Sequence, residues 1–212
     1  MTDTLEAGVA PRQNLWTWVF NPFYYLAGGQ ALALGLAFIL AAGLIGSAVN
    51  AHLDGVLDAH VGLQAPIWVF PVEGIIDWLS MAVTLWGAGL LLSRTRFRAL
   101  DILGTQALAR VPAILLVAVA FIPGFQAQAM KLASGDFGIV PAELAAFVMG
   151  MCVTVLMVIW MVILMYRGFA MSCNVSGGKA IGAFIVALIL AEILSKAAIM
   201  GLLFVAIPGF WM

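Results

Sequence analysis

Two histidines and two aspartates lie within one nine-residue segment of this 212-residue chain, His52, Asp54, Asp58 and His60. Imidazole nitrogens and carboxylate oxygens are the ligand types of zinc and ferrous iron. Asp54-Gly55 is a turn signal that would fold the two halves of the segment together, and Glu73 could add a carboxylate. The segment predicts a divalent metal site, with zinc as the example. The alternative is a solvated loop in which Asp58 caps a helix.

A second group of charges, Glu192 and Lys196, lies in an otherwise apolar run near the C-terminus. Residues four apart share a helix face, so the two side chains can neutralise each other. An ionisable residue at the centre of a membrane span costs about 2.5 to 3.5 kcal/mol and needs an explanation. A self-paired structural element and a proton or ion relay are the two alternatives. Asp77 is a further acid, predicted at the outer end of its own run.

These charges stand out because the chain has so few of them. Apolar residues make up 65% of the sequence and Asp, Glu, Lys and Arg only 9%, whereas an ordinary soluble domain is about a quarter charged. The net charge of −1 excludes a globally basic nucleic-acid binder. Histidine occurs only at positions 52 and 60, and no nucleophile constellation is present, which argues against an enzyme. The composition predicts an integral membrane protein.

Apolar runs of about 20 residues, the length that crosses a bilayer as a helix, predict five transmembrane helices. We expect them at residues 26–49, 75–92, 107–122, 144–166 and 180–206. Continuous apolar runs exclude a membrane β-barrel, whose strands alternate apolar and polar residues. The predicted fold class is all-α, a polytopic membrane helical bundle. It follows an N-terminal segment, 1–25, with an interfacial aromatic anchor, and precedes a short outer tail, 207–212.

Basic residues orient these spans, because they accumulate on the cytoplasmic side of a membrane. Seven of the eight basic residues near the spans fall on one side, and Lys131 is the exception. Four of the seven form a predicted cytoplasmic cluster between the second and third spans, Arg94, Arg96, Arg98 and Arg110. The N-terminus is therefore predicted to be cytoplasmic and the C-terminus outside. Residues 1–10 hold no basic residue, so no cleaved signal peptide is expected.

Three segments carry a resemblance to a known family. Residues 21–29, Asn-Pro-Phe-Tyr-Tyr-Leu-Ala-Gly-Gly, enter the first span, and the basic segment 97–112 runs into a third span that contains Pro112. A short loop after the fourth span leads to Lys179-Ala180, which opens the fifth. In these features the chain, from about Asn21 to Ala206, resembles the Yip family of five-span membrane proteins in its broad sense. Because the N-terminal segment is far shorter than the GTPase-engaging region of eukaryotic members, the resemblance implies a multi-pass protein of a bacterial inner membrane.

Three functions remain open at this point. The first choice is a noncatalytic scaffold or assembly subunit, whose partners would be membrane lipid, another copy of itself or another membrane protein, and no nucleic acid. The second is an ion-coupled permease that uses Glu192, Lys196 and Asp77. The third is a metal-dependent membrane enzyme with an outer site built from the histidines and aspartates of residues 52–60.

Overall fold

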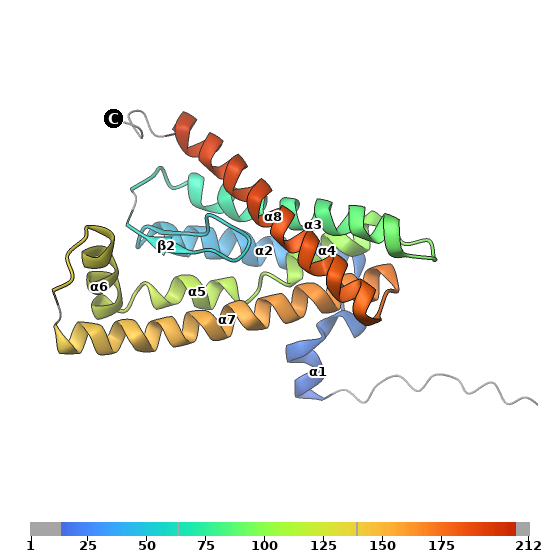
Figure 1. Ribbon diagram of the computed structural model, residues 1–212, viewed down its shortest axis with the longest axis horizontal. Coiled ribbons are helices and arrows are strands. Elements are labelled where there is room, and N and C mark those ends of the chain that lie inside the picture. The colour runs from blue at the N-terminus through green and yellow to red at the C-terminus, as the bar shows by residue number, and fades with distance from the viewer. Residues whose placement is uncertain (1–13, 63, 139, 207–212) are drawn as a thin grey trace, which may run out of the picture.

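The computed structural model describes residues 14–62, 64–138 and 140–206 (Figure 1). Its elements, in chain order, are α1 (Leu15–Phe20), the 3-10 turn η1 (Pro22–Tyr24), α2 (Gly28–Ser47), β1 (Ala51–His52), β2 (His60–Val61), α3 (Val69–Leu92), α4 (Ala99–Leu108), α5 (Ala113–Val119), α6 (Pro123–Ala133), α7 (Pro141–Cys173) and α8 (Gly177–Ala206). The predicted all-α bundle is confirmed. The predicted outer tail, 207–212, and the first half of the N-terminal segment lie outside the described residues.

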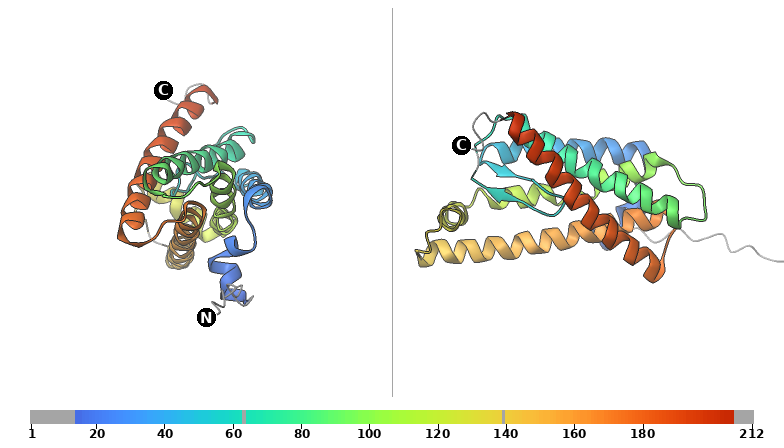
Figure 2. Two further views of the ribbon diagram at one scale, coloured as in Figure 1. Left: turned by 90° about the vertical axis from the view of Figure 1, so that its right-hand side faces the viewer. Right: turned by 45° about the horizontal axis from the view of Figure 1, so that its top comes forward.

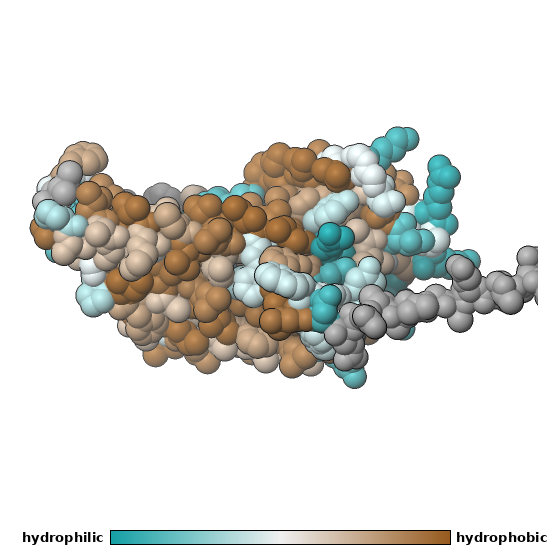
Figure 3. Space-filling view, turned by 90° about the horizontal axis from the view of Figure 1, so that it is seen from below, coloured by the Kyte–Doolittle hydropathy of each residue, from teal (hydrophilic) through white to brown (hydrophobic). Residues whose placement is uncertain are grey.

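Five helical segments are long and apolar enough to cross a membrane: Gly28–Ser47, Val69–Leu92, Ala99–Val119, Pro141–Cys173 and Gly177–Ala206. This number agrees with the prediction and is compatible with a multi-pass membrane protein. The face seen in Figure 3 is mostly apolar, and its polar side chains gather mainly at the end that carries α1 and the connection from α3 to α4. That distribution is expected of a chain whose flank faces lipid.

The second and third spans lie elsewhere than the sequence predicted. α3 begins at Val69 rather than at residue 75, and the third span covers residues 99–119 rather than 107–122. The helices extend past an acidic residue before each predicted start, Glu73 in α3 and Asp101 in α4, and each of these acids has a partner, His52 or Arg98. The third span is two helices, α4 and α5, separated at Pro112, whose ring nitrogen cannot donate a backbone hydrogen bond. Directly after the predicted end of this span, Pro123 begins α6.

Glycines let the first three spans approach closely. A Cβ at Gly35 of α2 would meet the backbone of Ala107 and Leu108 in α4, and one at Gly43 would meet the backbone of Pro71 in α3. Small residues at such contacts favour helix association in membranes, because dispersion contacts replace a hydrophobic driving force. These contacts make α2, α3 and α4 one tightly packed unit.

The last two helices form an open V. α7 has 33 residues and is therefore about 50 Å long, and a short connection with Asn174 in the left-handed region (φ 50°) leads into α8. From there α8 crosses the bundle diagonally over α3 and diverges from α7, as both side views show (Figures 1 and 2). The segment between α2 and α3 lies between these two diverging helices (Figures 1 and 2).

That segment is a re-entrant hairpin, where the sequence predicted an outer loop. β1 and β2 pair antiparallel, with His52 opposite His60, and the tip between them turns back into the bundle. Leu53 and Val56 of this segment are buried, and Val56 packs in the same apolar core as Met81 and Leu108. Irregular backbone at membrane depth is tolerated only where protein or a polar cavity satisfies its hydrogen bonds, so the partners of this tip identify the candidate site.

Candidate functional site

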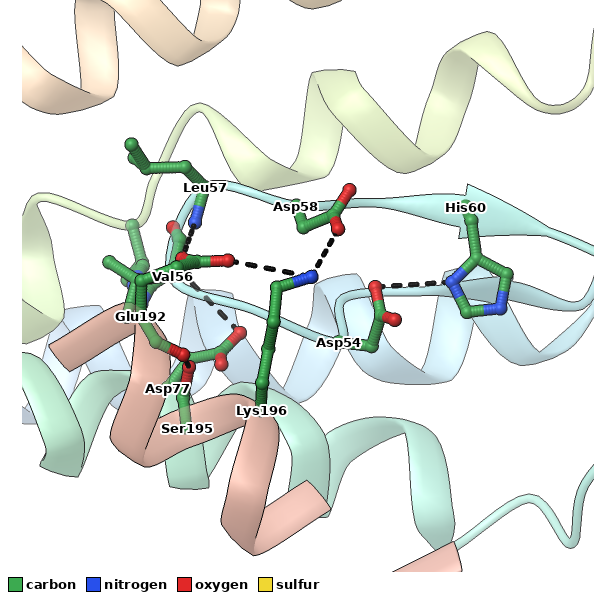
Figure 4. Close-up of polar contacts among 10 residues, drawn as sticks. Asp54, Val56, Leu57, Asp58, His60, Asp77, Glu192, Ser195 and Lys196 are labelled. Atoms are coloured by element: carbon green, nitrogen blue, oxygen red, sulfur yellow. Dashed lines mark hydrogen bonds and ion pairs between the residues drawn. The ribbon is translucent and has the colours of Figure 1, made fainter. Parts of the chain in front are cut away.

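Charged side chains from two spans hold the hairpin tip (Figure 4). Arg110 Nη1 donates a hydrogen bond to the carbonyl oxygen of Val56 at 2.9 Å. The backbone N–H of Leu57 donates to Glu192 Oε2 at 3.0 Å. Buried backbone groups need such partners, and here ionised side chains supply them. The tip is therefore held by Glu192, which the sequence singled out in the fifth span, and by Arg110, which the sequence assigned to the cytoplasmic basic cluster.

The predicted pairing of Glu192 with Lys196 is present, and it is part of a larger group. Lys196 Nζ lies 3.6 Å from Glu192 Oε1 and also pairs with the carboxylate of Asp58 on the hairpin. A Cβ at Gly55 would collide with the Glu192 carboxylate, so the turn glycine also permits this approach. No helix begins at Asp58, and the predicted capping role is wrong.

The predicted positions of Arg110, in the third span, and of Asp77, in the second, are also wrong. Arg110 is only 4% exposed and lies 3.8 Å from Asp77 of α3, so it does not belong to the cytoplasmic basic cluster. Asp77 is fully buried and lies eight residues after Val69, about 12 Å along the helix, rather than at its outer end. The two side chains lie close together inside the bundle, and a count of charges along the sequence cannot detect this contact.

The other three arginines of that cluster, Arg94, Arg96 and Arg98, are exposed at the connection between α3 and α4. Arg98 pairs with Asp101 at 3.1 Å. Without Arg110, six of the seven basic residues near the spans still fall on the predicted cytoplasmic side. The distribution of basic residues therefore still supports the predicted orientation, which stays a prediction.

The two histidines each face a carboxylate of their own. His52 Nδ1 lies 2.8 Å from Glu73 Oε1, with both side chains fully buried, and His60 Nδ1 lies 3.1 Å from Asp54 Oδ1. The imidazole rings stack at a centroid distance of 5.1 Å. The bond to Asp54 raises the pKa of His60 against the opposing effect of burial. Burial would raise the pKa of Asp54, but the hydrogen bond to His60 and the charges of His60 and Lys196 together outweigh this and lower it. The pairing therefore favours the charged forms of both His60 and Asp54.

These contacts place the predicted metal ligands in three separate pairs. His52 binds Glu73, His60 binds Asp54, and Asp58 binds Lys196. Within the part of the chain that the structure describes, no group of three or more His, Cys, Asp or Glu side chains could hold a metal ion. The five residues do not form one ligand set, because the hairpin register directs each imidazole at a separate carboxylate.

Toward the end of the bundle that carries the connection from α3 to α4, buried and partly buried polar side chains continue from Arg110. Gln106, one turn before Arg110, donates to the carbonyl of Met165 at 3.0 Å. Thr105 and Ser172 are hydrogen bonded at 3.1 Å, and Ser93 donates to the carbonyl of Cys173 at 2.7 Å. Sequence reasoning missed these residues because uncharged polar side chains at the end of a span or within it are compatible with solvent-facing positions, and their partners lie on another helix. The i, i+4 spacing of Gln106 and Arg110 is the signal that could have indicated them.

No protein-family model matches the chain, and no curated protein or solved structure matches it either. The resemblance to the Yip family therefore stays a prediction from sequence features. Any function has to be argued from the site itself.

Proposed function

We propose that the protein is an ion-coupled permease that moves protons through the acid–base cluster at the hairpin tip. The observation that carries the proposal is that the hairpin and three membrane spans bring five ionisable side chains together: Asp58, Asp77, Arg110, Glu192 and Lys196. Ionisable residues within membrane spans are rare, and they typically mark ion pathways or proton relays.

The charge balance of this cluster supports proton binding. Three carboxylates face two cations, so the cluster carries a net charge of −1 when all five groups are ionised. A surplus charge away from bulk water is costly, and a bound proton or cation removes it. Glu192 is the central carboxylate, since it contacts both the Leu57 N–H and Lys196. It lies 15 residues from the start of α8 and 14 from its end.

Polar groups extend from the cluster toward both ends of the bundle. On the outer side, the Lys196 and Asp58 side chains are 43% and 50% exposed, and the His60 side chain is 43% exposed. On the inner side, Gln106 and the bonded pair Thr105 and Ser172 continue toward the connection after α7. Side chains of this kind, with water between them, form the proton relays of pumps and transporters.

The test is proton flux into liposomes that contain the purified full chain. A potassium gradient with valinomycin sets the membrane potential, and an internal pH-sensitive dye reports proton entry. We expect flux above that of empty liposomes and a loss of at least tenfold in Glu192→Gln, which keeps the shape of the side chain but cannot exchange the proton.

The matched control is Glu143→Gln, because Glu143 pairs with Lys131 at 2.6 Å between α6 and α7, away from the cluster. This variant should retain wild-type flux. Wild-type flux equal to that of empty liposomes would refute the proposal, as would a folded Glu192→Gln protein with full flux.

A scaffold or assembly subunit is the second candidate, and one observation favours it. Lys196 and Asp58 remain about half exposed on the flank between α7 and α8, where contact with lipid is unfavourable. A second copy or another membrane protein would cover these charges as effectively as water would. Native mass spectrometry from lipid nanodiscs separates the two candidates: a strictly monomeric, partner-free protein with proton flux leaves no role for a scaffold.

A further inference from the structure

A cavity of about 310 Å³ lies between the hairpin and helices α5, α6 and α7. Its walls include His52 and His60 from the hairpin, Phe125 and Ala129 from α6, and Phe147 from α7. Thr154 is the other polar lining residue, and the remaining lining side chains are apolar. Mostly apolar cavities with a few converging polar groups are typical of sites for small molecules. The proton cluster does not line this cavity, so it is a separate site.

The size and the wall shapes of the cavity favour a flat ligand. Its volume is roughly twice the ~150 Å³ of a cavity that binds benzene. Flat rings line the walls: Phe125 and Phe147, which stack at a centroid distance of 5.4 Å, and His60, which stacks on the fully buried His52 at 5.1 Å. Planar rings gain from offset stacking on such faces beyond the area they bury. A molecule with two fused rings fits these dimensions.

The charges behind the cavity favour an uncharged ligand with one accepting oxygen. Each lining imidazole already pairs with a carboxylate, Glu73 for His52 and Asp54 for His60, so neither pair leaves a charged group over to bind an ionic ligand. A charged ligand would lose its hydration among apolar walls without a free counter-charge. A protonated imidazole has two N–H donors. His60 uses Nδ1 for Asp54, and its Nε2–H can donate to a ligand oxygen.

We propose that this cavity binds an uncharged, flat, two-ring molecule from the bilayer, through a carbonyl oxygen that accepts a hydrogen bond from His60. The apolar rings lie among the side chains of α5, α6 and α7. The carbonyl faces the hairpin. The proposal requires no proton movement through the Glu192 cluster and stands independently of it.

Equilibrium dialysis of the full chain in lipid nanodiscs tests this binding, with menadione as the probe and empty nanodiscs as the reference for partition into lipid. 2-Methylnaphthalene, which has the same two rings without carbonyls, is the matched probe. We expect saturable binding of both, with menadione about tenfold tighter. His60→Phe keeps a flat ring but removes the donor. This variant should weaken the binding of menadione about tenfold, which corresponds to about 1.4 kcal/mol, and leave the affinity for 2-methylnaphthalene unchanged.

A second variant tests the location of the ligand. Ala129→Trp fills the cavity from α6 and should abolish binding of both probes, whereas Ile189→Trp on the exposed face of α8 should change neither. Binding no greater than that of empty nanodiscs overturns the proposal, as does unchanged binding in Ala129→Trp. Two further results on the wild-type protein overturn the assigned chemistry: equal affinity for the two probes, or tighter binding of the anion 2-naphthoate than of menadione.

Discussion

Replacing Arg110 by methionine tests whether the buried charges act as one unit. The guanidinium is 4% exposed, donates to the Val56 carbonyl at 2.9 Å and faces the fully buried Asp77 at 3.8 Å. Removing one partner of a buried ion pair costs about 3–5 kcal/mol, because the other charge stays buried without compensation. We therefore expect Arg110→Met to lower the free energy of unfolding by about that amount.

The double variant tests whether the loss of stability in Arg110→Met comes from leaving Asp77 without its partner. Asp77→Asn alone leaves the arginine with only the Val56 carbonyl, so it should also be strongly destabilising. Combining it with Arg110→Met removes both charges, and what remains is mainly the lost hydrogen bond to Val56, about 1–3 kcal/mol. The interaction energy from the cycle should then be about 3 kcal/mol or more, at or above the upper end of the 0.5–3 kcal/mol range seen for contacting residues.

Reversible unfolding by steric trapping in bilayer-like micelles measures these free energies. The control is Arg98→Met, since Arg98 belongs to an exposed pair with Asp101 and its loss should leave stability unchanged. Strictly additive effects of Arg110→Met and Asp77→Asn would refute the reasoning, because they would mean that the two charges are separately hydrated. A loss no larger than that of Arg98→Met would refute it as well.

Three further predictions concern packing, pH and topology. Gly35→Val should destabilise by about 1–3 kcal/mol, because its side chain would meet the α4 backbone, as thermal unfolding would measure. Asp54→Asn should lower the pKa of His60 toward its ordinary value of 6.5, because the bond to Asp54 raises this pKa. An NMR titration would measure the change. A fluorescent reporter that matures only in the cytoplasm, fused after residue 212, should be dark, because the C-terminus is predicted outside.

The pH dependence of the His60 pair has a defined sign. Because the folded-state pKa of His60 is raised, its stabilisation is complete below the unfolded value of about 6.5. It is lost as the pH rises through the folded-state pKa. The pKa of Asp54 is lowered, so its share is present above about pH 3.9 and is lost as the pH falls through the lower folded-state value. Asp54→Asn should remove both dependences, and a wild-type His60 that titrates below 6.5 would contradict the assignment.

Controls for the other two predictions come from the same chain. Gly29→Ala should be tolerated, because a Cβ at this position meets nothing within 4 Å. A reporter inserted between residues 174 and 176, in the connection from α7 to α8, should be fluorescent. A bright reporter after residue 212 would contradict the five-span orientation, and a stable Gly35→Val protein would contradict the close contact of α2 with α4.

The sequence predicted the elements that depend on composition alone. Helices α2 and α8 lie within three residues of the predicted spans, and α7 contains its predicted span and continues to Cys173, because runs of about 20 apolar residues have few other structures in a bilayer. The i, i+4 contact of Glu192 and Lys196 followed from helix periodicity. The start of α3 and the position of the third span did not follow from hydropathy, because α3 extends past Glu73 and α4 past Asp101, and both acids have partners. A charge marks a boundary only when it faces water, and that depends on its partners.

Composition and periodicity determined the class, the number of spans and one of the ion pairs, because these properties are local along the chain. Only the tertiary structure decided that residues 50–62 turn back into the bundle, that Arg110 meets Asp77, and that the two histidines face separate carboxylates. The contacts of Arg110 with Asp77 and of His52 with Glu73 join residues far apart in sequence, because a buried polar group must find a partner wherever the packing offers one. The hairpin turn brings His60 to Asp54. The sequence supplies the groups, while the distances between them, and hence the chemistry open to them, arise from how the helices pack.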